Sequence, residues 1–394
     1  MHTVPLSQKL ILLLGGASLL TIPFSPIVSF GIAMFTLLTM SKYLIGYFRQ
    51  CLILLVFVSV LIIIASRNYT DELEHDLSHY FMVYKALSSG YYSEIFGFSG
   101  GIEVGWPLIY LLISKCTTNL SPVSIAVINT SICLFLLYVW MLKYAFKNVL
   151  HSQIGIIAAL IILFASIQTY GYLQRQAIST VILLFAISTS GKKSLFFLAI
   201  ATLFHLTSLP IGLFYLLLKK YHSKINLRHI IIIFILMITI KLNLYLVLKF
   251  LSEVGAGLPG VNKLNFYLMT ATEFSFTSKR FAILIFPLTI ILMLCWNKID
   301  NNHWKIIAIF SCLSYIGFLG VPLGPERINF ILLYIYGYFV YMYIYKLYPS
   351  LTTYFILIYV LLFIVEKLNL FGNSIDPFWS RYPFFSFEPF YYLY

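Results

Sequence analysis

The sequence predicts an all-α fold, a polytopic bundle of transmembrane helices that forms a single integral membrane domain over residues 1–394. Hydrophobic residues make up 61% of the chain and charged residues only 10%, whereas about 25% of the residues in soluble domains are charged. The apolar residues occur in blocks of about 15–22, each long enough to cross roughly 30 Å of hydrocarbon as a helix. Because lipid offers the backbone no hydrogen-bond partners, each block is predicted to be helical.

The basic residues predict how these helices are oriented. The chain carries 26 Lys and Arg against 13 Asp and Glu, and most of the cations fall in short segments between apolar blocks. Since positively charged short loops stay in the cytoplasm, the densest one, KKYHSKINLRH at 219–229, is predicted to be cytoplasmic. The pattern has no basic surface with interleaved aromatic residues, which excludes nucleic acid as a partner and leaves the lipid bilayer.

Counting outward from this loop gives about eleven crossings. The stretch 194–218 is apolar but has lysines at both ends, so we predict a re-entrant hairpin broken at 204–210, where Pro210 interrupts the helix. The first block lacks a small-residue cleavage site and is predicted to remain as an uncleaved helix. The predicted spans are 8–22, 27–41, 50–66, 121–142, 154–170, 177–189, 229–250, 280–296, 306–321, 328–346 and 351–367.

Two segments are predicted to lie on the outer side of the membrane. One is 67–120, with a short amphipathic helix and an apolar piece at 106–114, and the other is the loop 251–279. Acidic residues contribute little to orientation, so the clustering of six of them in the first segment indicates another role. These six are Asp71, Glu72, Glu74, Asp76, Glu94 and Glu103.

Arginine occurs at two short turns that this orientation places outside, although positive charge is disfavoured there. Arg175 lies in TYGYLQRQAIS between two apolar blocks, and Arg327 lies in GPERIN. In one interpretation each side chain reaches the lipid phosphates and anchors its helices. In the other, its fork of N–H donors binds a phosphate or carboxylate ligand. Arg280 begins a later span and either joins this set or marks the membrane interface.

Five further residues could supply acid–base chemistry or contacts to a sugar. Asp76, Tyr80 and Tyr84 recur at four-residue spacing and share one face of a helix. This face forms either an interfacial aromatic stripe or the mouth of a cavity. Glu103 adds a second acid before the apolar piece. His205 lies at the predicted helix break, as either a structural hydrogen-bonding group or a general base.

No metal, cofactor or disulfide is predicted. The five cysteines are scattered without a CxxC pair, and no pair of acids with metal-ligand spacing stands out on the outer side. The glycine-rich stretch GFSGGIEVG lacks the lysine and hydroxyl residue of a nucleotide-binding loop, so nucleotide binding is excluded as well.

Taken in order along the chain, these motifs resemble the EpsG-like, Wzy-type polysaccharide polymerases, and the resemblance spans roughly 67–330. The motifs are D-x-x-x-Y-x-x-x-Y (Asp76, Tyr80, Tyr84), E-x-G (Glu103, Gly105), R-Q (Arg175, Gln176), F-H-x-x-S (Phe204, His205, Ser208) and a late external arginine (Arg327).

The resemblance implies a multi-pass glycosyltransferase of the bacterial inner membrane, GT-C-like in architecture, with its active site facing the periplasm. Such an enzyme joins repeat units carried on undecaprenyl diphosphate into O-antigen or a related polymer, and a chain-length regulator is an implied partner. Asp76, Glu103 and His205 are then the candidate catalytic bases. The candidate substrate-binding residues are Arg175, Arg327, Arg280, Tyr80, Tyr84 and Gln176. A lipid-linked oligosaccharide flippase, an O-antigen ligase and a membrane O-acetyltransferase are the alternatives.

Overall fold

The fold is that of a computed structural model, which describes residues 6–44, 46–67, 76–147, 149–165, 167–243, 279–298, 303–318, 328–339 and 385–393, together with isolated residues at 246, 249–250, 253–254 and 383. Within these ranges every regular element is a helix, as the sequence predicts. The predicted span 351–367 and nearly all of the predicted loop 251–279 lie outside the described residues.

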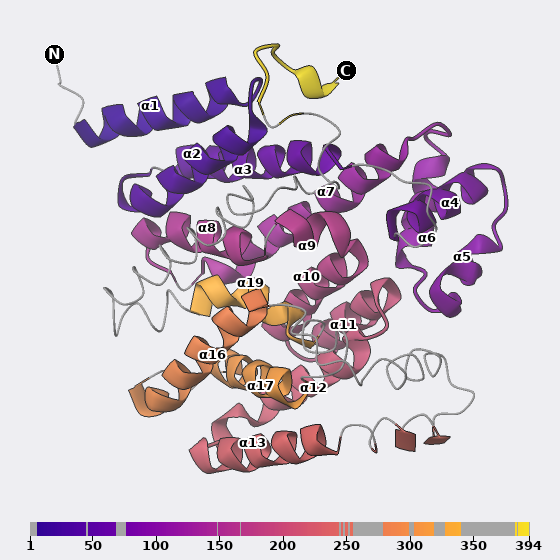
Figure 1. The fold of residues 1–394 in the computed structure, drawn as a ribbon, viewed down its shortest axis with the longest axis vertical. Coiled ribbons are helices and arrows are strands. Elements are labelled where there is room, and N and C mark those ends of the chain that lie inside the picture. Colours follow the sequence, from indigo (N-terminus) through magenta and orange to yellow (C-terminus); the bar gives the residue numbers. More distant parts are fainter. Residues whose placement is uncertain are drawn as a thin grey trace.

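The first three helices pack against one another at one end of the molecule (Figure 1). At the start of the second helix, the Ser25 hydroxyl accepts a hydrogen bond from Val28 N at 3.3 Å and Pro26 occupies the first helical position. Both features favour a helix start. The C-terminal segment lies on the preceding turn, where Ser386 N donates to Phe24 O at 3.0 Å. The three helices are α1 (Leu6–Thr21), α2 (Pro26–Thr39) and α3 (Gly46–Ala65).

A lobe of three short helices projects from the side of the bundle (Figure 1). Its first helix corresponds to the predicted amphipathic helix, and its last helix to the predicted apolar piece at 106–114. These two helices pack against each other, and the first also contacts the central helix α7. The lobe consists of α4 (Asp76–Ser88), α5 (Glu94–Gly97) and α6 (Gly105–Ser114).

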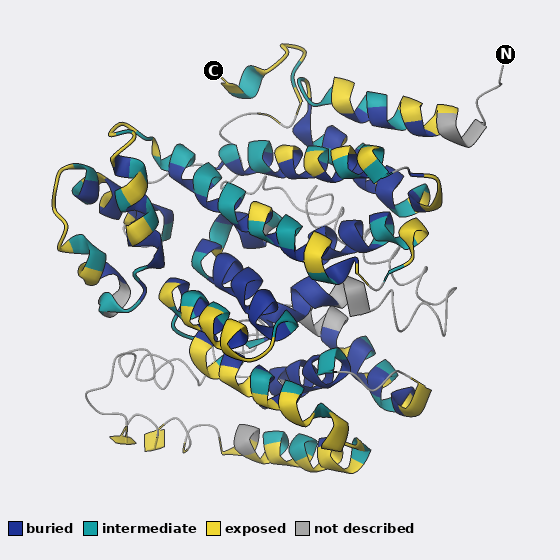
Figure 2. Ribbon diagram, turned by 180° about the vertical axis from the view of Figure 1, so that it is seen from behind, coloured by how far each residue is buried: buried dark blue, intermediate teal, exposed yellow. Residues whose placement is uncertain are grey.

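The centre of the bundle is formed by helices that are buried on most sides, as Figure 2 shows for α10. Every residue of this helix from Gln176 to Ile187 is buried. The turn before it is shorter than predicted, because α9 ends at Tyr172 and α10 begins at Gln174. Arg175 therefore lies in a first helical turn and not in a loop. The central helices are α7 (Pro122–Trp140), α8 (Ile154–Ala165), α9 (Ile167–Tyr172), α10 (Gln174–Ser188) and α19 (Phe330–Phe339).

A break is present within the predicted 204–210, but it spans only 205–207, and Pro210 lies in the first turn of the helix that follows, where proline is tolerated. Helices α11 (Lys192–Phe204) and α12 (Ser208–Tyr221) pack against each other on either side of the break. At 13 and 14 residues, each is about 20 Å long, which is shorter than the hydrocarbon thickness of about 30 Å. The remaining helices of the described part are α13 (Leu227–Leu242), α16 (Lys279–Leu294) and α17 (His303–Gly317).

Helix length supports membrane insertion but not the predicted number of crossings. In the described residues two helices are long and apolar enough to cross a membrane, Gly46–Ala65 and Pro122–Ala145. Six shorter apolar helices of 10–17 residues accompany them. The eleven predicted crossings are therefore not confirmed, because most apolar blocks form helices below the length that a straight crossing requires.

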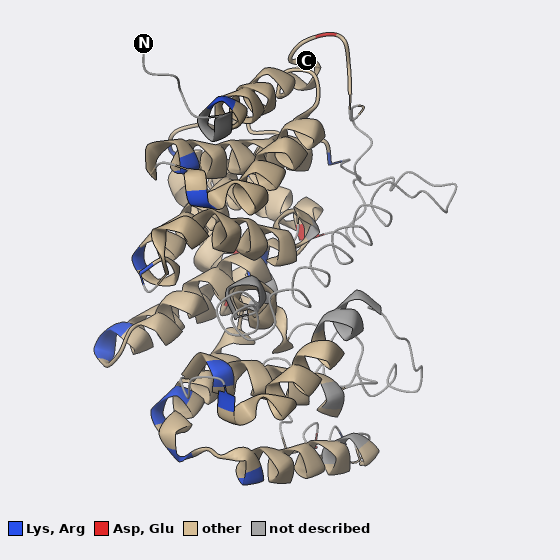
Figure 3. Ribbon diagram, turned by 90° about the vertical axis from the view of Figure 1, so that its left-hand side faces the viewer, with Lys and Arg blue, Asp and Glu red and all other residues tan. Residues whose placement is uncertain are grey.

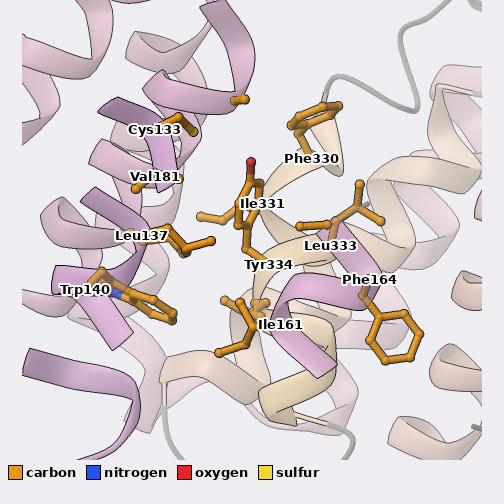
Figure 4. Packing of buried hydrophobic residues seen from close by; sticks show 14 of the residues in the cluster. Cys133, Leu137, Trp140, Ile161, Phe164, Val181, Phe330, Ile331, Leu333 and Tyr334 are labelled. Carbon is orange, nitrogen blue, oxygen red and sulfur yellow. The ribbon is translucent and has the colours of Figure 1, made fainter. Parts of the chain in front are cut away.

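The basic residues gather on one side of the bundle, whereas the hydrophobic core runs through its central helices. Figure 3 shows Lys and Arg gathered along one side of the ribbon. The hydrophobic core is continuous between the central helices, and α19 lies within it. In Figure 4, Tyr334 of α19 lies among buried side chains of α7 and α8, and its hydroxyl points away from Ile161 of α8. Its ring also meets the ring of Tyr170 edge-on, with centroids 6.1 Å apart. This core fixes the position of α10, on whose first turn Arg175 lies.

Candidate functional site

Four of the residues singled out from the sequence form one connected cluster at the junction of the lobe and the bundle. Asp76 begins α4, Glu103 precedes α6, Arg175 lies in the first turn of α10, and His205 lies in the break after α11. They come from segments that are far apart in the sequence, and ion pairs and hydrogen bonds join them directly. We call these four residues the acid cluster.

Arg175 is the centre of the acid cluster. Its Nη2 lies 2.9 Å from Oδ1 of Asp76, and its Nη1 lies 2.9 Å from Oε2 of Glu103. The Arg175 side chain is 19% exposed, so it turns inward and does not extend into lipid. The aromatic ring of Phe98 lies beneath the guanidinium, with 5.5 Å between Cζ and the ring centroid, a distance at which cation–π attraction acts.

Glu103 is the most enclosed member, with a side chain that is 2% exposed. Besides Arg175, its carboxylate accepts hydrogen bonds at Oε1 from Leu206 N at 3.0 Å and from the ring of His205 at 2.9 Å. Burial raises the pKa of this carboxyl, but the hydrogen bonds from His205 and Leu206 and the charge of Arg175 outweigh burial and lower the pKa to about 2. Glu103 is therefore ionised at neutral pH and a weak base.

The ionised Glu103 fixes the tautomer of His205. A carboxylate can only accept a hydrogen bond, so the Nδ1 atom of His205 must donate to it. In the neutral ring the lone pair then lies on Nε2. This atom has no hydrogen-bond partner in the described part of the chain. A histidine that is oriented by a carboxylate and has a free Nε2 has the arrangement of a general base.

Close packing between α6 and the end of α11 holds Glu103 against His205. A Cβ atom at Gly105 would lie 2.9 Å from the ring of Phe204 and 3.0 Å from Leu203 O, so only glycine allows this approach. Trp106 adds an edge-on contact to the Phe204 ring, with centroids 5.3 Å apart. The E-x-G and F-H motifs of the sequence therefore meet in space.

Asp76 is the most open carboxylate of the cluster, with a side chain that is 38% exposed. Its Oδ2 lies 3.4 Å from the hydroxyl of Tyr80, which is fully buried. One helical turn along α4, Tyr84 donates its hydroxyl to Thr117 O at 2.7 Å. Tyr80 thus contacts the acid cluster directly, whereas Tyr84 holds the segment that leads into α7.

The remaining predicted residues lie at or beyond the edge of the described site. Gln176 lines a narrow pocket between α10, α12 and α19 that has room on the order of one water molecule. Ser208 and Ile328 also line this pocket, so it lies beside segments that follow His205 and Arg327 in the sequence. Arg327 itself and the side chain of Arg280 are outside the described residues.

A buried amide network, which the sequence analysis missed, supports the first turn of α10. The Gln174 side chain accepts from Asn129 Nδ2 at 2.8 Å and donates to Ala126 O at 3.0 Å. Asn129 also exchanges hydrogen bonds with the Tyr110 hydroxyl. An asparagine inside an otherwise apolar run was the available signal, because a buried amide needs partners.

Metal-binding clusters and disulfides are absent from the described residues. No group of three or more His, Cys, Asp or Glu side chains is arranged there to hold a metal ion. None of the five cysteines forms a disulfide.

The apolar helices and the enclosed acid cluster define a class of protein, a helical membrane protein with a cluster of charged side chains where the lobe meets the bundle. The chain belongs to the EpsG family, which it matches over residues 50–392. The matched region includes every member of the acid cluster. No curated protein and no solved structure matches the chain.

Proposed function

We propose that this protein is a glycan polymerase of the bacterial inner membrane, which extends O-antigen or a related polysaccharide on the periplasmic face. Its substrates are oligosaccharide repeat units carried on undecaprenyl diphosphate. EpsG family membership supports a polymerase-type activity on glycans. The single observation that carries the proposal is the acid cluster, in which Arg175 joins two carboxylates and one of them orients His205.

In the proposed reaction, a hydroxyl of the acceptor unit attacks the anomeric carbon of the growing chain. A new glycosidic C–O bond forms, and the bond from that carbon to the diphosphate oxygen breaks. Undecaprenyl diphosphate leaves with the bonding electron pair, and the hydroxyl proton passes to a base. We assign this base to Nε2 of His205, which Glu103 orients through Nδ1.

The three candidate bases can be ranked by their surroundings. Glu103 is 2% exposed, is surrounded by donors and has a pKa lowered to about 2, so it positions other groups and does not accept the proton. Asp76 is open to the outside and is assigned to hydrogen-bond the acceptor sugar. The buried phenol of Tyr80 supports this carboxylate.

Arg175 is assigned to the leaving diphosphate. Negative charge grows on the diphosphate as its bond to the sugar breaks, and a preorganised guanidinium stabilises that charge more in the transition state than in the ground state. Asp76 and Glu103 already neutralise Arg175, so binding of a diphosphate requires further positive charge. Arg327 and Arg280, both predicted on the outer side, are proposed to supply it.

Deletion of the gene in its native host, followed by gel analysis of lipopolysaccharide, tests the proposal. Loss of a polymerase leaves the core carrying a single repeat unit, whereas loss of a flippase or a ligase leaves the core with none. The variants Arg175→Ala, Arg327→Ala and His205→Gln are expected to give the single-unit pattern at normal protein abundance, with His229→Gln as the histidine control. A full-length ladder from Arg175→Ala would refute the role of that residue.

The periplasmic orientation has its own test. Alkaline phosphatase is active only outside the cytoplasm, so a fusion after Gln176 is expected to be active and a fusion after Lys220 inactive. An expressed but inactive fusion at Gln176 would reverse the proposed orientation, irrespective of the reaction that the protein catalyses.

A further inference from the structure

A second arginine, Arg67, lies close to the acid cluster although no sequence pattern singled it out. It lies two residues after the end of α3 and is 3% exposed. Its Nη1 donates to Gly171 O at 2.6 Å, and its guanidinium lies over the ring of Tyr172, with 4.7 Å from Cζ to the centroid. These two partners are the last residues of α9. Arg67 thus binds the chain immediately before the break that leads to Arg175.

The break between α9 and α10 determines where Arg175 points. Leu173 is the one residue between the two helices, and its dihedral angles of φ −96° and ψ 46° lie outside the helical region. Gln174 anchors the far side of the break through Asn129. Arg67 anchors the near side, so the direction of the first turn of α10 is fixed from both sides.

Arg67 also interacts electrostatically with Asp76 of the acid cluster. Burial lowers the pKa of Arg67, whereas the negative charge of Asp76 opposes that shift. Its Nε is buried and has no hydrogen-bond partner in the described residues. A buried guanidinium with an unsatisfied N–H is costly, and a hydrophobic residue of similar volume would pack here without that cost. The arginine is therefore better explained by positioning than by stability.

The same helix provides a matched control at its other end. Arg49 is 5% exposed, donates from Nη1 to His151 O at 2.9 Å, and also has a buried Nε without a partner in the described residues. Arg49 in the first turn of α3 and Arg67 just beyond its end thus bind the two ends of the α8–α9 segment, at His151 and at Gly171. Arg67 differs from Arg49 in lying next to the acid cluster.

We propose that Arg67 is a positioning residue for the transfer reaction, which holds the break between α9 and α10 so that Arg175 reaches Asp76 and Glu103. The claim about activity rests on the proposed function, whereas the claim about the position of Arg175 does not. Arg67→Lys is the informative variant. Lysine keeps the charge but cannot both bond Gly171 O and cover the Tyr172 ring as the planar fork does.

The position of Arg175 is tested without any assay of activity. Phenylglyoxal reacts with accessible guanidinium groups, and mass spectrometry of the purified full-length protein quantifies labelling at Arg175. Arg67→Lys is expected to raise this labelling severalfold, because a less restrained first turn leaves its ion pairs more often. Arg49→Lys is expected to match the wild-type protein. Equal labelling of Arg175 in Arg67→Lys and wild type would overturn the proposal.

The consequence for activity is tested by polymerisation of lipid-linked repeat units with purified protein. Arg67→Lys is expected to lower kcat by about 10²-fold with little change in KM, because a small misplacement of a catalytic group has that effect, while Arg49→Lys leaves both unchanged. In an Arg175→Lys background, Arg67→Lys should cause no further loss. Additive losses, or an equal loss in Arg49→Lys, would overturn the proposal. A wild-type protein that extends no glycan would refute the proposed function alone, since labelling still decides the role of Arg67.

Discussion

Cations serve different purposes at the two ends of this bundle. One region contains Lys219, Lys220 and Lys305, and we call it the lysine-rich side. Its buried or half-buried cations, Lys219 and Lys305, donate to backbone carbonyls. Lys219 Nζ binds Ile187 O and Thr189 O at the end of α10, and Lys305 Nζ binds Trp296 O at 2.6 Å. In the acid cluster, the cation Arg175 instead binds two carboxylates.

Under the proposed function, this difference separates residues that stabilise the fold from residues that take part in the reaction. A carbonyl at a helix end is a fixed dipole that cannot change its protonation, and a lysine there completes the hydrogen bonding of the last turn. The acid cluster contains an imidazole that a carboxylate orients, and the protonation of an imidazole can change during a reaction. Substitutions should therefore reduce activity at the acid cluster and reduce stability at the lysine-rich side.

The largest expected effect is that of Glu103→Gln. The amide cannot accept from His205, Leu206 and Arg175 together, and the charge that holds Arg175 is lost. We expect polymerisation to fall by about 10³-fold, as when a single preorganised catalytic contact is removed. Removing one partner of a buried ion pair should also lower the free energy of unfolding by about 3 kcal/mol. Activity per folded molecule and thermal unfolding in detergent separate the two effects.

Glu94→Gln is the matched control for this variant. Glu94 begins α5 in the same lobe and is only half-buried, so its substitution should change neither activity nor stability. If Glu103→Gln kept more than about a tenth of the wild-type activity, the acid cluster would contribute no more to the reaction than the lysine-rich side does.

Gly105→Ala should have a smaller effect on the same site. The added methyl would lie 2.9 Å from the Phe204 ring, so α6 must shift away from α11 and carry Glu103 away from His205. We expect a loss of activity of about tenfold or more from this displacement, and a loss of about 1–3 kcal/mol from overpacking. Initial rates and melting temperatures measure both.

Gly31→Ala provides the control, since a Cβ atom there meets nothing within 4 Å. This residue lies inside α2, where alanine is expected to stabilise the helix by about 0.5–1 kcal/mol without altering activity. Unchanged activity in Gly105→Ala would show that the contact between α6 and α11 does not set the geometry of the acid cluster.

The sequence predicted elements of the fold better than contacts between them. Apolar blocks and breakers placed α6 and α7 within two residues and the break before α12 within three, because these depend on local composition. The sequence also singled out Asp76, Glu103, Arg175 and His205 separately. It did not predict that they bind one another, since the bonded partners lie 72 to 102 residues apart and their contacts depend on packing.

Arg175 shows why the geometry of the acid cluster could not be predicted from the sequence. Its position between two apolar blocks suggested a loop, yet a one-residue break left it in a helix. That geometry depends on Arg67 and on the Asn129–Gln174 pair, whose contacts with other helices no local pattern predicts. The predicted number of crossings is not confirmed for a related reason: hydropathy measures how apolar a block is, not whether a helix continues through it.

Lys219→Met tests whether the lysine-rich side serves stability alone. Loss of the ammonium leaves Ile187 O and Thr189 O without this donor, and unpaired buried carbonyls cost about 1–3 kcal/mol. We expect a lower melting temperature with kcat unchanged per folded molecule. The neighbouring Lys220 is exposed, so Lys220→Met should change the melting temperature little. A fall in kcat for Lys219→Met would show that the lysine-rich side takes part in the reaction.

The smallest expected effect is the contribution of Glu103 to the pH dependence of stability. The pKa of Glu103 is lowered from 4.5 to about 2 in the folded protein, so its contribution is complete above pH 4.5 and is lost as the pH falls toward 2. Between pH 6 and pH 4 this amounts to about 0.8 kcal/mol by linkage. Lysines stay protonated throughout this window, but on the lysine-rich side burial and the charges of Lys219 and His222 lower the pKa of His303 to about 4, so that side also loses stability as the pH falls. Melting temperatures should therefore fall between pH 6 and pH 4 in both wild type and Glu103→Gln, but by less in Glu103→Gln; an equal fall in the two would show that Glu103 does not contribute to the slope.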